Sequence, residues 1–412
     1  MWQMVRMRFP LLVFALSAAQ PFGVEAPVLV GHDVPAAPAT VAQTIAAQPN
    51  IAQPKSAQTI TAQATAAAGF PAWVARYREG AVSRGLKPDW VDATLKGAVY
   101  LPRVVELDRN QPDDSGRRNV FADYLARQLT RQRIDDGSSR AVAHAGTLKR
   151  IAAETGVPAE IIVAIWGMET SYGRVLGTFD LPSAIASLAY DARREALFTR
   201  ELDALVRMVG EGRAPRSRLR GSWAGAFGQS QFLPSSYLAY ARDGDGDGIA
   251  DIWGSRADTF MSIANYLKQH GWVAGTGWGL RVTVPAGFNR ATVANPERPT
   301  QCIRPLERHS RWLSAREWRA KGFQPLNALW PADAVPMTLV EPDGAGGGAY
   351  LTTASYRAIM EYNCSNFYAL SVALLGDAVA PAVRGVTGAS AVRGISGAPV
   401  VRGADAPASP RP

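Results

Sequence analysis

The chain has 412 residues, of which 47% are hydrophobic, and a formal net charge of +9. This length can hold two or three average domains with a globular core. The charge favours an anionic partner such as a nucleic acid, a membrane surface or an acidic polymer, but the absence of a Lys/Arg block interleaved with aromatic residues argues against nucleic acid. The four histidines are too scattered in the sequence to suggest a zinc or catalytic-triad motif.

The N-terminal residues have the pattern of an export signal. Arg6 and Arg8 precede the apolar run Phe9–Leu16, and Val24–Ala26 ends in an alanine at a plausible cleavage point. This pattern predicts a signal peptide over residues 1–26. An uncleaved anchor is the alternative, although the run is short for a membrane span. We find no other long apolar stretch and no cysteine near the signal, so we expect a soluble mature chain without a transmembrane segment or a lipid anchor.

Two segments of low complexity flank the body of the chain. Residues 27–68 are rich in Ala, Pro, Thr and Gln, and Ala42–Gln48 nearly recurs as Ala57–Gln63, which is typical of a flexible linker. Near the other end, Val-Arg-Gly recurs every nine residues. Short Gly/Pro-rich repeats cannot bury a core, so residues 379–412 are predicted to be disordered, with a basic tether to an anionic surface as the alternative. The folded body is therefore expected over residues 69–378.

Apolar periodicity and helix punctuation predict that most of residues 69–272 is helical. The expected helices are Phe70–Arg84, Pro88–Lys96, Arg118–Thr130, Ser138–Thr155, Pro158–Thr170, Leu181–Ala189, Arg193–Glu211, Pro234–Arg242 and Thr259–His270. Beyond residue 273, Leu280–Val284 and Met337–Val340 look like short strands and Gly344–Gly348 like a loop. Asn366–Leu375 returns to helix, with Asn366 as its N-cap. The predicted fold class is therefore mainly α, with a small mixed insert at about 273–353.

One acid, Glu169, lies at the end of an otherwise apolar predicted helix. The helix begins at Pro158, since proline suits the first helical position. Ile162, Trp166 and Glu169 recur at i, i+4 and i+7, so the acid points to the side where Ile and Trp point. Apolar surroundings and the negative end of the helix dipole both raise the pKa of a carboxyl group, which lets it act as an acid near neutral pH. The alternative is a surface glutamate at a fraying helix end.

The segment Gly221–Tyr237 combines small residues, aromatic residues and amides. Small residues let another chain approach closely, aromatic rings stack on sugar faces, and Ser and Gln side chains form hydrogen bonds with hydroxyl and amide groups. This combination is typical of a carbohydrate cleft. A Gly/aromatic turn that serves packing alone is the alternative.

The segment that begins at Asp243 resembles a calcium-binding loop. Asp side chains occupy positions 1, 3, 5 and 9, a glycine occupies position 6, and the residue at position 7 would contribute its carbonyl. Position 12 departs from the pattern, because Gly254 replaces the bidentate Glu, and position 8 is Ala250. Asp258 could supply the missing carboxylate. The expected ligands of a structural Ca²⁺ are Asp243, Asp245, Asp247, Ile249, Asp251 and Asp258. A solvated Gly/Asp turn is the alternative.

The two cysteines, Cys302 and Cys364, fit one disulfide in an oxidising compartment. Closing a loop of that length would contribute roughly 4 kcal/mol in the chain-entropy treatment. Two free buried thiols are the alternative.

Taken together, these segments resemble the membrane-bound lytic transglycosylase B family of bacterial cell-wall enzymes. The matching stretches, in order over about residues 70–376, are Ile165–Arg174, Ala224–Tyr237, the Asp loop, Ser262–Leu267 and Tyr362–Leu370. The resemblance implies a catalytic domain over 69–378, with a lysozyme-like helical core at about 140–272 plus 354–376 and extra helical and small mixed subdomains. It also implies a periplasmic monomer that acts on peptidoglycan glycan strands without an organic cofactor.

The resemblance further implies the site residues. Glu169 is the catalytic acid/base by similarity, and the matching cleft positions are Ser222, Gln231, Tyr266, Tyr362 and Asn363. The family's calcium site maps onto the Asp loop, although the loop here is one residue longer before Asp258. Some relatives carry a C-terminal peptidoglycan-binding module. This chain has its low-complexity tail there, so we expect no such module.

The implied reaction cleaves the β-1,4 bond between N-acetylmuramic acid and N-acetylglucosamine. Protonated Glu169 donates to the glycosidic oxygen, and the N-acetyl group of the substrate assists in place of an enzyme nucleophile. Ionised Glu169 then removes the proton of the sugar's own 6-hydroxyl, which closes on the anomeric carbon. The product is 1,6-anhydromuramoyl, and no water is consumed. An intramolecular nucleophile gains from high effective concentration.

Two other functions stay open from the sequence. A muramidase would use water and need a second carboxylate roughly 5–9 Å away, for which Asp180 and Glu160 are candidates. A wall-binding scaffold would leave Glu169 silent.

Overall fold

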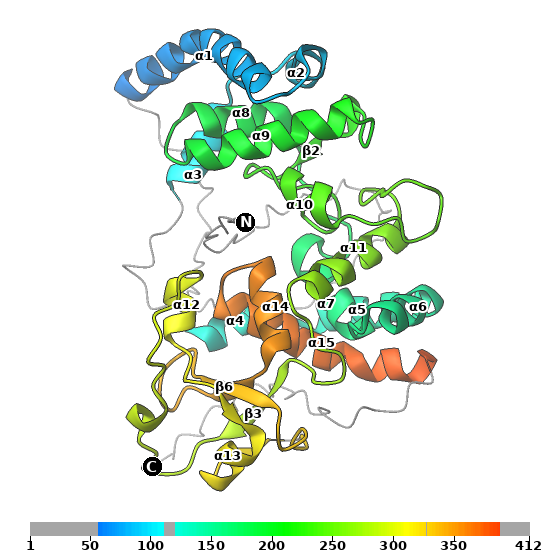
Figure 1. Ribbon diagram of the computed structural model, residues 1–412, viewed down its shortest axis with the longest axis vertical. Helices are drawn as coiled ribbons and strands as arrows, with labels where there is room; N and C mark the ends of the chain where they lie inside the picture. The colour runs from blue at the N-terminus through cyan, green and yellow to red at the C-terminus, as the bar shows by residue number, and fades with distance from the viewer. Residues whose placement is uncertain (1–56, 111–119, 327, 388–412) are drawn as a thin grey trace, which may run out of the picture.

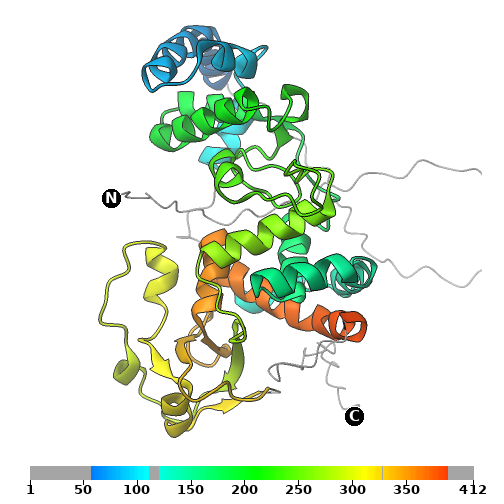
Figure 2. The same cartoon turned by 45° about the vertical axis from the view of Figure 1, so that its right-hand side comes forward.

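The computed structural model describes residues 57–110, 120–326 and 328–387. Within these ranges the chain is mainly helical, and its elements stack in three tiers along the long axis (Figure 1, Figure 2). Each tier encloses its own apolar cluster. The predicted signal peptide lies outside the described residues, as do residues 27–56 of the predicted linker and residues 388–412 of the predicted tail.

The upper tier is a group of helices that share one apolar core. They are α1 (Ala57–Ser83), α2 (Pro88–Leu95), α3 (Pro102–Arg109), α8 (Leu181–Tyr190) and α9 (Glu195–Gly210). Proline begins both α2 and α3, where its missing N–H would have no helical partner. Phe70, Phe198 and Leu202 lie in the core of this tier, and the loop residues Phe227 and Phe232 extend it towards the middle tier.

The middle tier surrounds α7 (Ala159–Thr170), in which every residue from Ile161 to Gly167 is buried. Its other helices are α4 (Phe121–Gln128), α5 (Arg131–Ala143), α6 (Ala145–Thr155), α11 (Arg256–Gln269), α14 (Ala354–Tyr362) and α15 (Asn366–Thr387). Of these, α15, α5, α11 and α6 pack against α7. The short helix α10 (Pro234–Tyr240) joins α9 to α11 across the tiers. The two-residue strands β1 (Phe179–Asp180) and β2 (Arg220–Gly221) pair with each other antiparallel.

The lower tier is a small antiparallel sheet with strand order β4-β6-β7-β3-β5. Its elements are β3 (Gly279–Thr283), β4 (Leu313–Ser314), β5 (Gln324–Pro325), β6 (Pro336–Val340), β7 (Ala349–Thr352), α12 (Ile303–Glu307) and α13 (Ala315–Ala320), with short 3₁₀ turns. Leu351 sits at the centre and pairs with Leu280 on one side and Leu339 on the other. Buried and exposed residues alternate along Leu280–Thr283, as one face of a strand packs on a core.

Several predicted boundaries need correction. Residues 57–68 of the predicted linker are helical because α1 already begins at Ala57, and residues 379–387 of the predicted tail are helical because α15 runs to Thr387. The single helix predicted over Ser138–Thr155 is two helices divided at His144. Helix α3 was not predicted.

Helices α8 and α9 were expected in the lysozyme-like core at 140–272, but they belong to the upper tier. Both helices pack with α1 to α3 in the upper cluster, whereas α4, from outside the expected core, packs around α7 and α15. Apolar periodicity shows that a helix has a buried face, and only tertiary contacts decide which neighbour covers it.

The predicted N-cap of α15 is wrong. Ser365 accepts the Tyr368 N–H at 3.3 Å and is therefore the capping residue. Asn366 instead uses its side chain in the protein interior, where it accepts hydrogen bonds from His309 and Tyr356 and donates to the Pro305 carbonyl.

Helix α15 is also an apolar stretch that the sequence reading overlooked. Among the described residues, α15 is the one single helix that is long and apolar enough to cross a membrane. The bent pair α6 and α7 reaches that length and hydropathy only when the two helices are counted as one span. In α15, 67% of the apolar window is buried inside the protein, where it packs on α7 and α5. Burial in the protein core therefore explains the apolar composition of α15.

Candidate active site

Glu169 lies in the last turn of α7 and faces the start of α15. Its Oε1 accepts a hydrogen bond from the Tyr368 hydroxyl at 2.5 Å. Burial raises the pKa of Glu169 from its ordinary 4.5 to about 7, while the hydrogen bond from Tyr368 opposes this rise. A large fraction of the carboxyl is therefore protonated near neutral pH. The group can donate a proton and then stabilise the resulting charge through a hydroxyl.

Three tyrosines from three different helices surround this carboxyl. Tyr124 comes from α4, Tyr362 ends α14 and Tyr368 lies in the first turn of α15. Burial, followed by the Glu169 charge, raises the pKa of Tyr124 to about 12 and the pKa of Tyr362 and Tyr368 well above their ordinary value. All three hydroxyls therefore remain neutral while Glu169 titrates. The pKa of Glu169 itself is set by burial and by the Tyr368 hydrogen bond, and no carboxylate is among these causes.

The two acids considered as a second carboxylate are engaged elsewhere. Asp180 caps α8 by accepting the Ser183 N–H, and Arg216 donates to both of its oxygens at 2.6 and 3.0 Å. Burial raises the pKa of Asp180, but the hydrogen bonds from Arg216 and Ser183 outweigh it and hold the pKa below its ordinary value. Glu160 lies nine residues from Glu169 on the same helix, about 13 Å along the axis. Neither position suits a base or nucleophile opposite Glu169.

The backbone after Glu169 makes an unusual turn. Ser171, Tyr172 and Gly173 follow one another with φ of 49°, 63° and 81°, a left-handed run that is costly for residues other than glycine. The tyrosine ring folds back on α7 over Gly167, where a Cβ would lie 2.5 Å from the ring. Its hydroxyl donates to the Arg133 carbonyl at 2.8 Å. These contacts hold the end of α7 and thereby the Glu169 side chain.

The structure brings the predicted aromatic cleft residues together. The rings of Tyr266 and Tyr362 lie 4.8 Å apart, and Phe232 contacts both. The Tyr362 hydroxyl donates to the Ser230 carbonyl at 2.6 Å, and the Tyr266 hydroxyl donates to the Glu361 carbonyl at 2.7 Å. The cluster therefore connects the loop before α10, α11 and the end of α14.

The predicted polar cleft residues have different surroundings. Ser222 accepts the Ala226 N–H within its own loop. Gln231, at φ 50°, donates to the Gly228 carbonyl at 2.9 Å and to the Leu176 carbonyl, which follows the end of α7, at 3.4 Å. Asn363 follows Tyr362, and its buried Oδ1 has no hydrogen-bond partner within the described chain; the same holds for Ser230 Oγ. Buried polar atoms are rarely left unpaired, so these two covered atoms beside Tyr362 mark a place where the described chain leaves polar groups without a partner.

Tyr368 and Tyr124 were missed as site residues. Tyr368 stands in the stretch Tyr362–Leu370 that carried the resemblance, where a polar hydroxyl within an otherwise apolar helix was the available signal. Tyr124 had no such signal, because nothing in the local sequence of α4 indicates which helix end it faces.

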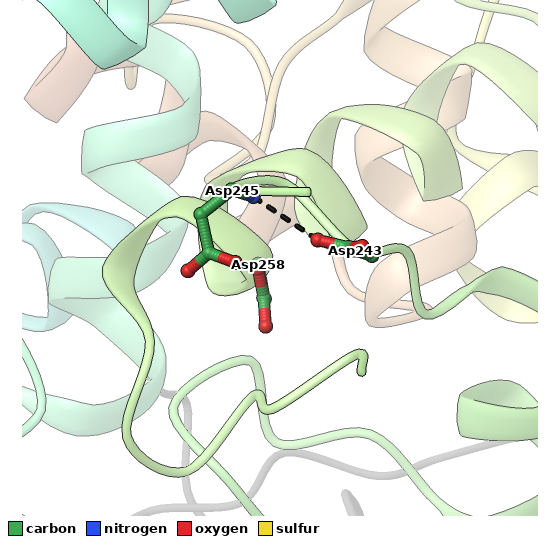
Figure 3. A group of neighbouring side chains, drawn as sticks. All are labelled: Asp243, Asp245 and Asp258. Carbon is green, nitrogen blue, oxygen red and sulfur yellow. Dashed lines mark hydrogen bonds between the residues drawn. The ribbon is translucent and has the colours of Figure 1, made fainter. Parts of the chain in front are cut away.

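The Asp loop brings three of its predicted ligands together (Figure 3). Carboxylate oxygens of Asp243, Asp245 and Asp258 lie within 4.8 Å of one another. Asp258 is buried, and its oxygens accept the Gly244 and Asp251 N–H groups at 2.8 and 2.6 Å. Burial, with a contribution from Asp245, raises the pKa of Asp258. Hard cations prefer converging carboxylate oxygens, so these three residues fit a Ca²⁺ ion.

The remaining predicted ligands are not part of this group. The Asp251 carboxylate pairs with Arg218 at 2.9 Å and accepts the Trp253 and Gly254 N–H groups. It therefore does not act as a ligand in this group, and it does not take the place of the Glu that is absent from position 12 of the loop. Asp247 accepts the Ile249 N–H at 2.8 Å. The Asp247 and Asp251 carboxylates are therefore not among the converging acids, whereas the Ile249 carbonyl stays a predicted ligand.

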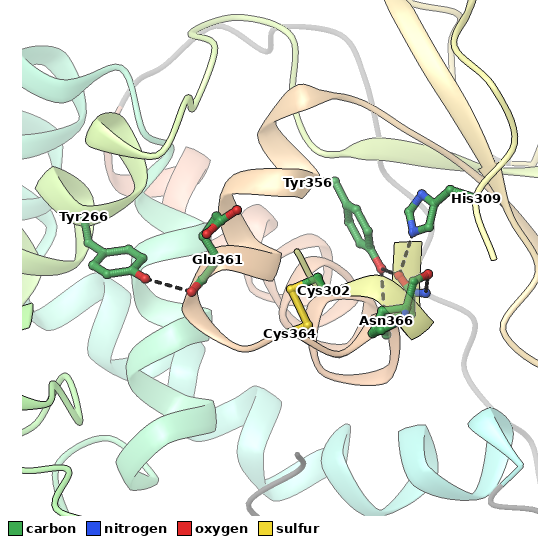
Figure 4. The surroundings of a disulfide bond; sticks show 8 residues. Tyr266, Cys302, His309, Tyr356, Glu361, Cys364 and Asn366 are labelled. Atoms are coloured by element: carbon green, nitrogen blue, oxygen red, sulfur yellow. Dashed lines mark hydrogen bonds between the residues drawn. A yellow bond between two sulfur atoms is a disulfide. The ribbon is translucent and has the colours of Figure 1, made fainter. Parts of the chain in front are cut away.

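The predicted disulfide between Cys302 and Cys364 is confirmed. It joins the start of α12 to the turn between α14 and α15, and Figure 4 shows it between the Tyr266–Glu361 contact and the His309–Asn366 contact. Burial lowers the pKa of His309 to about 3, with Arg357 adding to the effect, so the imidazole is neutral. The turn that carries Asn363 is thus fixed covalently and by hydrogen bonds.

Glu169 is a half-buried acid whose pKa is raised and whose surroundings are neutral hydroxyls, which suits a general acid/base site in an enzyme. The chain belongs to the Transglycosylase SLT domain family, which matches residues 69–377. The predicted fold class, mainly α with a lysozyme-like core and small mixed subdomain, is confirmed.

Known relatives agree with this assignment. The membrane-bound lytic murein transglycosylase B of Escherichia coli (strain K12) is 32% identical over 295 residues, which cover 70% of this chain and 77% of that protein. The structure of SltB3 from Pseudomonas aeruginosa in complex with NAG-anhNAM-pentapeptide has a TM-score of 0.67 at 36% identity, and covers 80% of this chain and 82% of that one. The Escherichia coli lytic transglycosylase Slt35 in complex with calcium has a TM-score of 0.61 at 30% identity, with 75% and 93% covered.

Proposed function

We propose that this chain is a lytic murein transglycosylase that cleaves the β-1,4 bond between N-acetylmuramic acid and N-acetylglucosamine in peptidoglycan. The observation that carries the proposal is Glu169, whose pKa of about 7 suits an acid that must donate and then accept a proton. Membership of the family and the peptidoglycan fragment bound by the relative SltB3 support the substrate class.

The reaction needs one carboxyl group on the enzyme. Glu169 donates its proton to the glycosidic oxygen as the C1–O4 bond breaks, and the carbonyl oxygen of the substrate's N-acetyl group bonds to C1. The Glu169 carboxylate then takes the proton of the 6-hydroxyl, O6 bonds to C1, and the N-acetyl oxygen leaves. Glu169 ends protonated, and the product is a 1,6-anhydromuramoyl sugar. The Tyr368 hydroxyl stabilises the carboxylate between the two steps.

The aromatic and polar groups beside Glu169 supply a sugar-binding surface. Tyr266 and Tyr362 are half-buried aromatic rings with Phe232 packed behind them, and the unpaired atoms of Asn363 and Ser230, an acceptor and a hydroxyl, lie beside Tyr362. We assign Ser222 and Gln231 to the loop that shapes this surface. This arrangement fits a ligand with both apolar sugar faces and amide or hydroxyl groups.

We further propose that Asp243, Asp245 and Asp258 hold a structural Ca²⁺ ion, as the calcium complex of the relative Slt35 suggests. A periplasmic location and a monomeric state are part of the same proposal. The disulfide supports an oxidising compartment, and residues 1–26 supply the predicted export signal.

Digestion of purified peptidoglycan tests the function. The mature protein and the Glu169→Gln variant are incubated with it, and released muropeptides are analysed by mass spectrometry. We expect products lighter by one water than reducing muropeptides, absent from the variant digest. Reducing ends would identify a muramidase instead. Binding by both proteins without any release would identify a scaffold.

A further inference from the structure

Gln229 is a fully buried amide between the catalytic helix and the Asp loop. Its Oε1 accepts the indole N–H of Trp166 at 2.9 Å, and its Nε2 donates to the Trp253 carbonyl at 3.0 Å. An indole nitrogen can only donate and a carbonyl can only accept, so both bonds fix the orientation of the amide. The side chain therefore joins α7 to the segment that follows the aspartates.

The backbone of Gln229 repeats this connection. Its N–H donates to the Ile252 carbonyl at 2.8 Å. Its carbonyl accepts the hydroxyl proton of Thr170 at 3.1 Å, which Thr170 shares with the Trp166 carbonyl four residues back at 3.2 Å. Thr170 is the neighbour of Glu169, and its hydroxyl oxygen also accepts the Gly173 N–H at 3.0 Å. One residue thus bonds twice to the end of α7 and twice to residues 252–253.

Close packing leaves little room for these segments to move independently. A Cβ on Gly173 would lie 2.5 Å from Gln229 Oε1, and a Cβ on Gly228 would lie 2.7 Å from the Ile252 side chain. Displacement of the 252–253 segment therefore acts directly on the turn after Glu169.

The other end of this path is Asp258. Its Oδ2 accepts the N–H of Asp251 at 2.6 Å, immediately before Ile252 and Trp253. A cation held by Asp258 together with Asp243 and Asp245 fixes the position of that carboxylate and of the backbone bonded to it. The path from the acids to Glu169 then runs through Asp251, residues 252–253, Gln229 and Thr170.

We propose that Gln229 is a positioning residue that couples Ca²⁺ in the Asp loop to the geometry of Glu169. The Ca²⁺ site and the role of Glu169 both rest on the proposed function, but the exchange measurement below tests the coupling without requiring turnover. Equilibrium coupling is reciprocal, so loss of Gln229, which loosens the turn after Glu169, also weakens Ca²⁺ binding. Catalysis falls for a separate reason, because Glu169 is then held less firmly.

Two variants and one control test the coupling. Gln229→Met removes both side-chain bonds at similar volume, and Thr170→Val removes the hydroxyl that joins α7 to Gln229. Thr155→Val is the matched control: Thr155 is also buried, donates to the carbonyl four residues back and accepts a following N–H, but at the end of α6. It controls for loss of a buried hydroxyl.

Ca²⁺ affinity is measured by calorimetry. Amide hydrogen exchange at residues 171–173, and kcat and KM on soluble muropeptide chains, are each measured with CaCl₂ and with EDTA. In the unaltered protein we expect Ca²⁺ to slow exchange at 171–173 about tenfold, within the usual range of coupling free energies. In Gln229→Met we expect that effect to disappear, with Ca²⁺ affinity and kcat each about tenfold lower and KM within twofold. Thr170→Val should weaken the effect, and Thr155→Val should retain it.

The coupling is overturned if Ca²⁺ leaves exchange at 171–173 unchanged in the unaltered protein, including the case in which no Ca²⁺ binds. It is also overturned if Gln229→Met keeps the full effect. Absence of turnover in every protein, with the exchange effect intact, would instead contradict the proposed function and leave the coupling standing.

Discussion

The two ends of α7 carry one acid each, Glu160 and Glu169, and burial raises the pKa of both. At the first end Glu160 lies near Asp377 and Arg384 of α15, and the Trp278 N–H donates to Asp377 at 3.1 Å. At the second end, the partner of Glu169 is a tyrosine hydroxyl from the start of the same α15.

The difference indicates that burial alone does not suit an acid to the catalytic role proposed for Glu169. Glu160 lies near a second carboxyl, that of Asp377, whose pKa it helps to raise. Glu169 has neutral hydroxyls around it, unpaired polar atoms close to Tyr362 and a left-handed turn that fixes its backbone. Catalysis requires that a raised pKa be combined with access and fixed geometry.

The largest effect should come from changing the two acids in parallel. Glu169→Gln removes the proton donor, so we expect kcat on peptidoglycan to fall by at least about 10³-fold. Glu160→Gln keeps the helix but changes a residue about 13 Å away, so we expect kcat within about threefold of the unaltered protein. Steady-state release of anhydromuropeptides measures both. Equal losses in the two variants would contradict the distinction between the two ends.

The disulfide tests the comparison between the two ends of α7, because it stabilises only the end that carries Glu169. Replacing Cys302 and Cys364 by serine should lower the free energy of unfolding by roughly 4 kcal/mol, measured by denaturant titration. Below the unfolding transition we expect KM to rise, since Cys364 lies next to Asn363. Reduction of the unaltered protein should reproduce both results. An unchanged KM would show that the turn keeps its shape without the bond.

The hydroxyl of Tyr368 should set the pH range of activity. The acid form of Glu169 starts the reaction, so kcat/KM should fall as pH rises through about 7. The hydrogen bond from Tyr368 lowers the pKa of Glu169. Tyr368→Phe should therefore move this fall to higher pH and reduce the maximum about tenfold, the equivalent of one hydrogen bond. A pH profile that moves to lower pH would contradict the assignment.

The smallest effect should be a gain in stability at the Glu160 end. Burial, with Glu160 adding to it, raises the pKa of Asp377 to about 8, compared with roughly 3.9 in an unfolded chain. The folded protein thus holds this proton to higher pH, so its contribution to stability is full below pH of about 4 and is lost as pH rises to about 8.

Asp377→Asn stays neutral at every pH and keeps an acceptor for Trp278. We expect its melting temperature to exceed that of the unaltered protein by about 2–4 °C at pH 8 and to match it at pH 4. Activity at pH 6 is the control and should not change. A loss of stability at pH 8 would indicate that Asp377 is ionised and paired in the folded protein.

Much of this site could be predicted from local sequence. The periodicity of Ile162, Trp166 and Glu169 predicts an acid on an apolar helix, and the segment Gly221–Tyr237 predicts a sugar-binding loop. Alternate aspartates predict a cation loop, but which of them converge could not be predicted, because Asp251 turns to Arg218 from a distant segment.

For the helices too, some features could be predicted from local sequence and others only from the tertiary structure. Proline at the start of α2 and the apolar spacing of α7 are local signals, and both helices were predicted within a few residues. The join of α8 and α9 to the upper tier depends on which apolar faces meet, and periodicity carries no information about the partner.

The sequence by itself determined which residues are candidates for the chemistry: one acid on an apolar helix, a cluster of aspartates and two cysteines. Local spacing fixes these because helical and turn geometry repeat over a few residues. Only the tertiary structure decided that Tyr368 and Tyr124 face Glu169, that Asp258 joins Asp243 and Asp245, and that Gln229 lies between the two sites. Those contacts join segments far apart in the chain, and close packing selects them from many arrangements that the same local patterns allow.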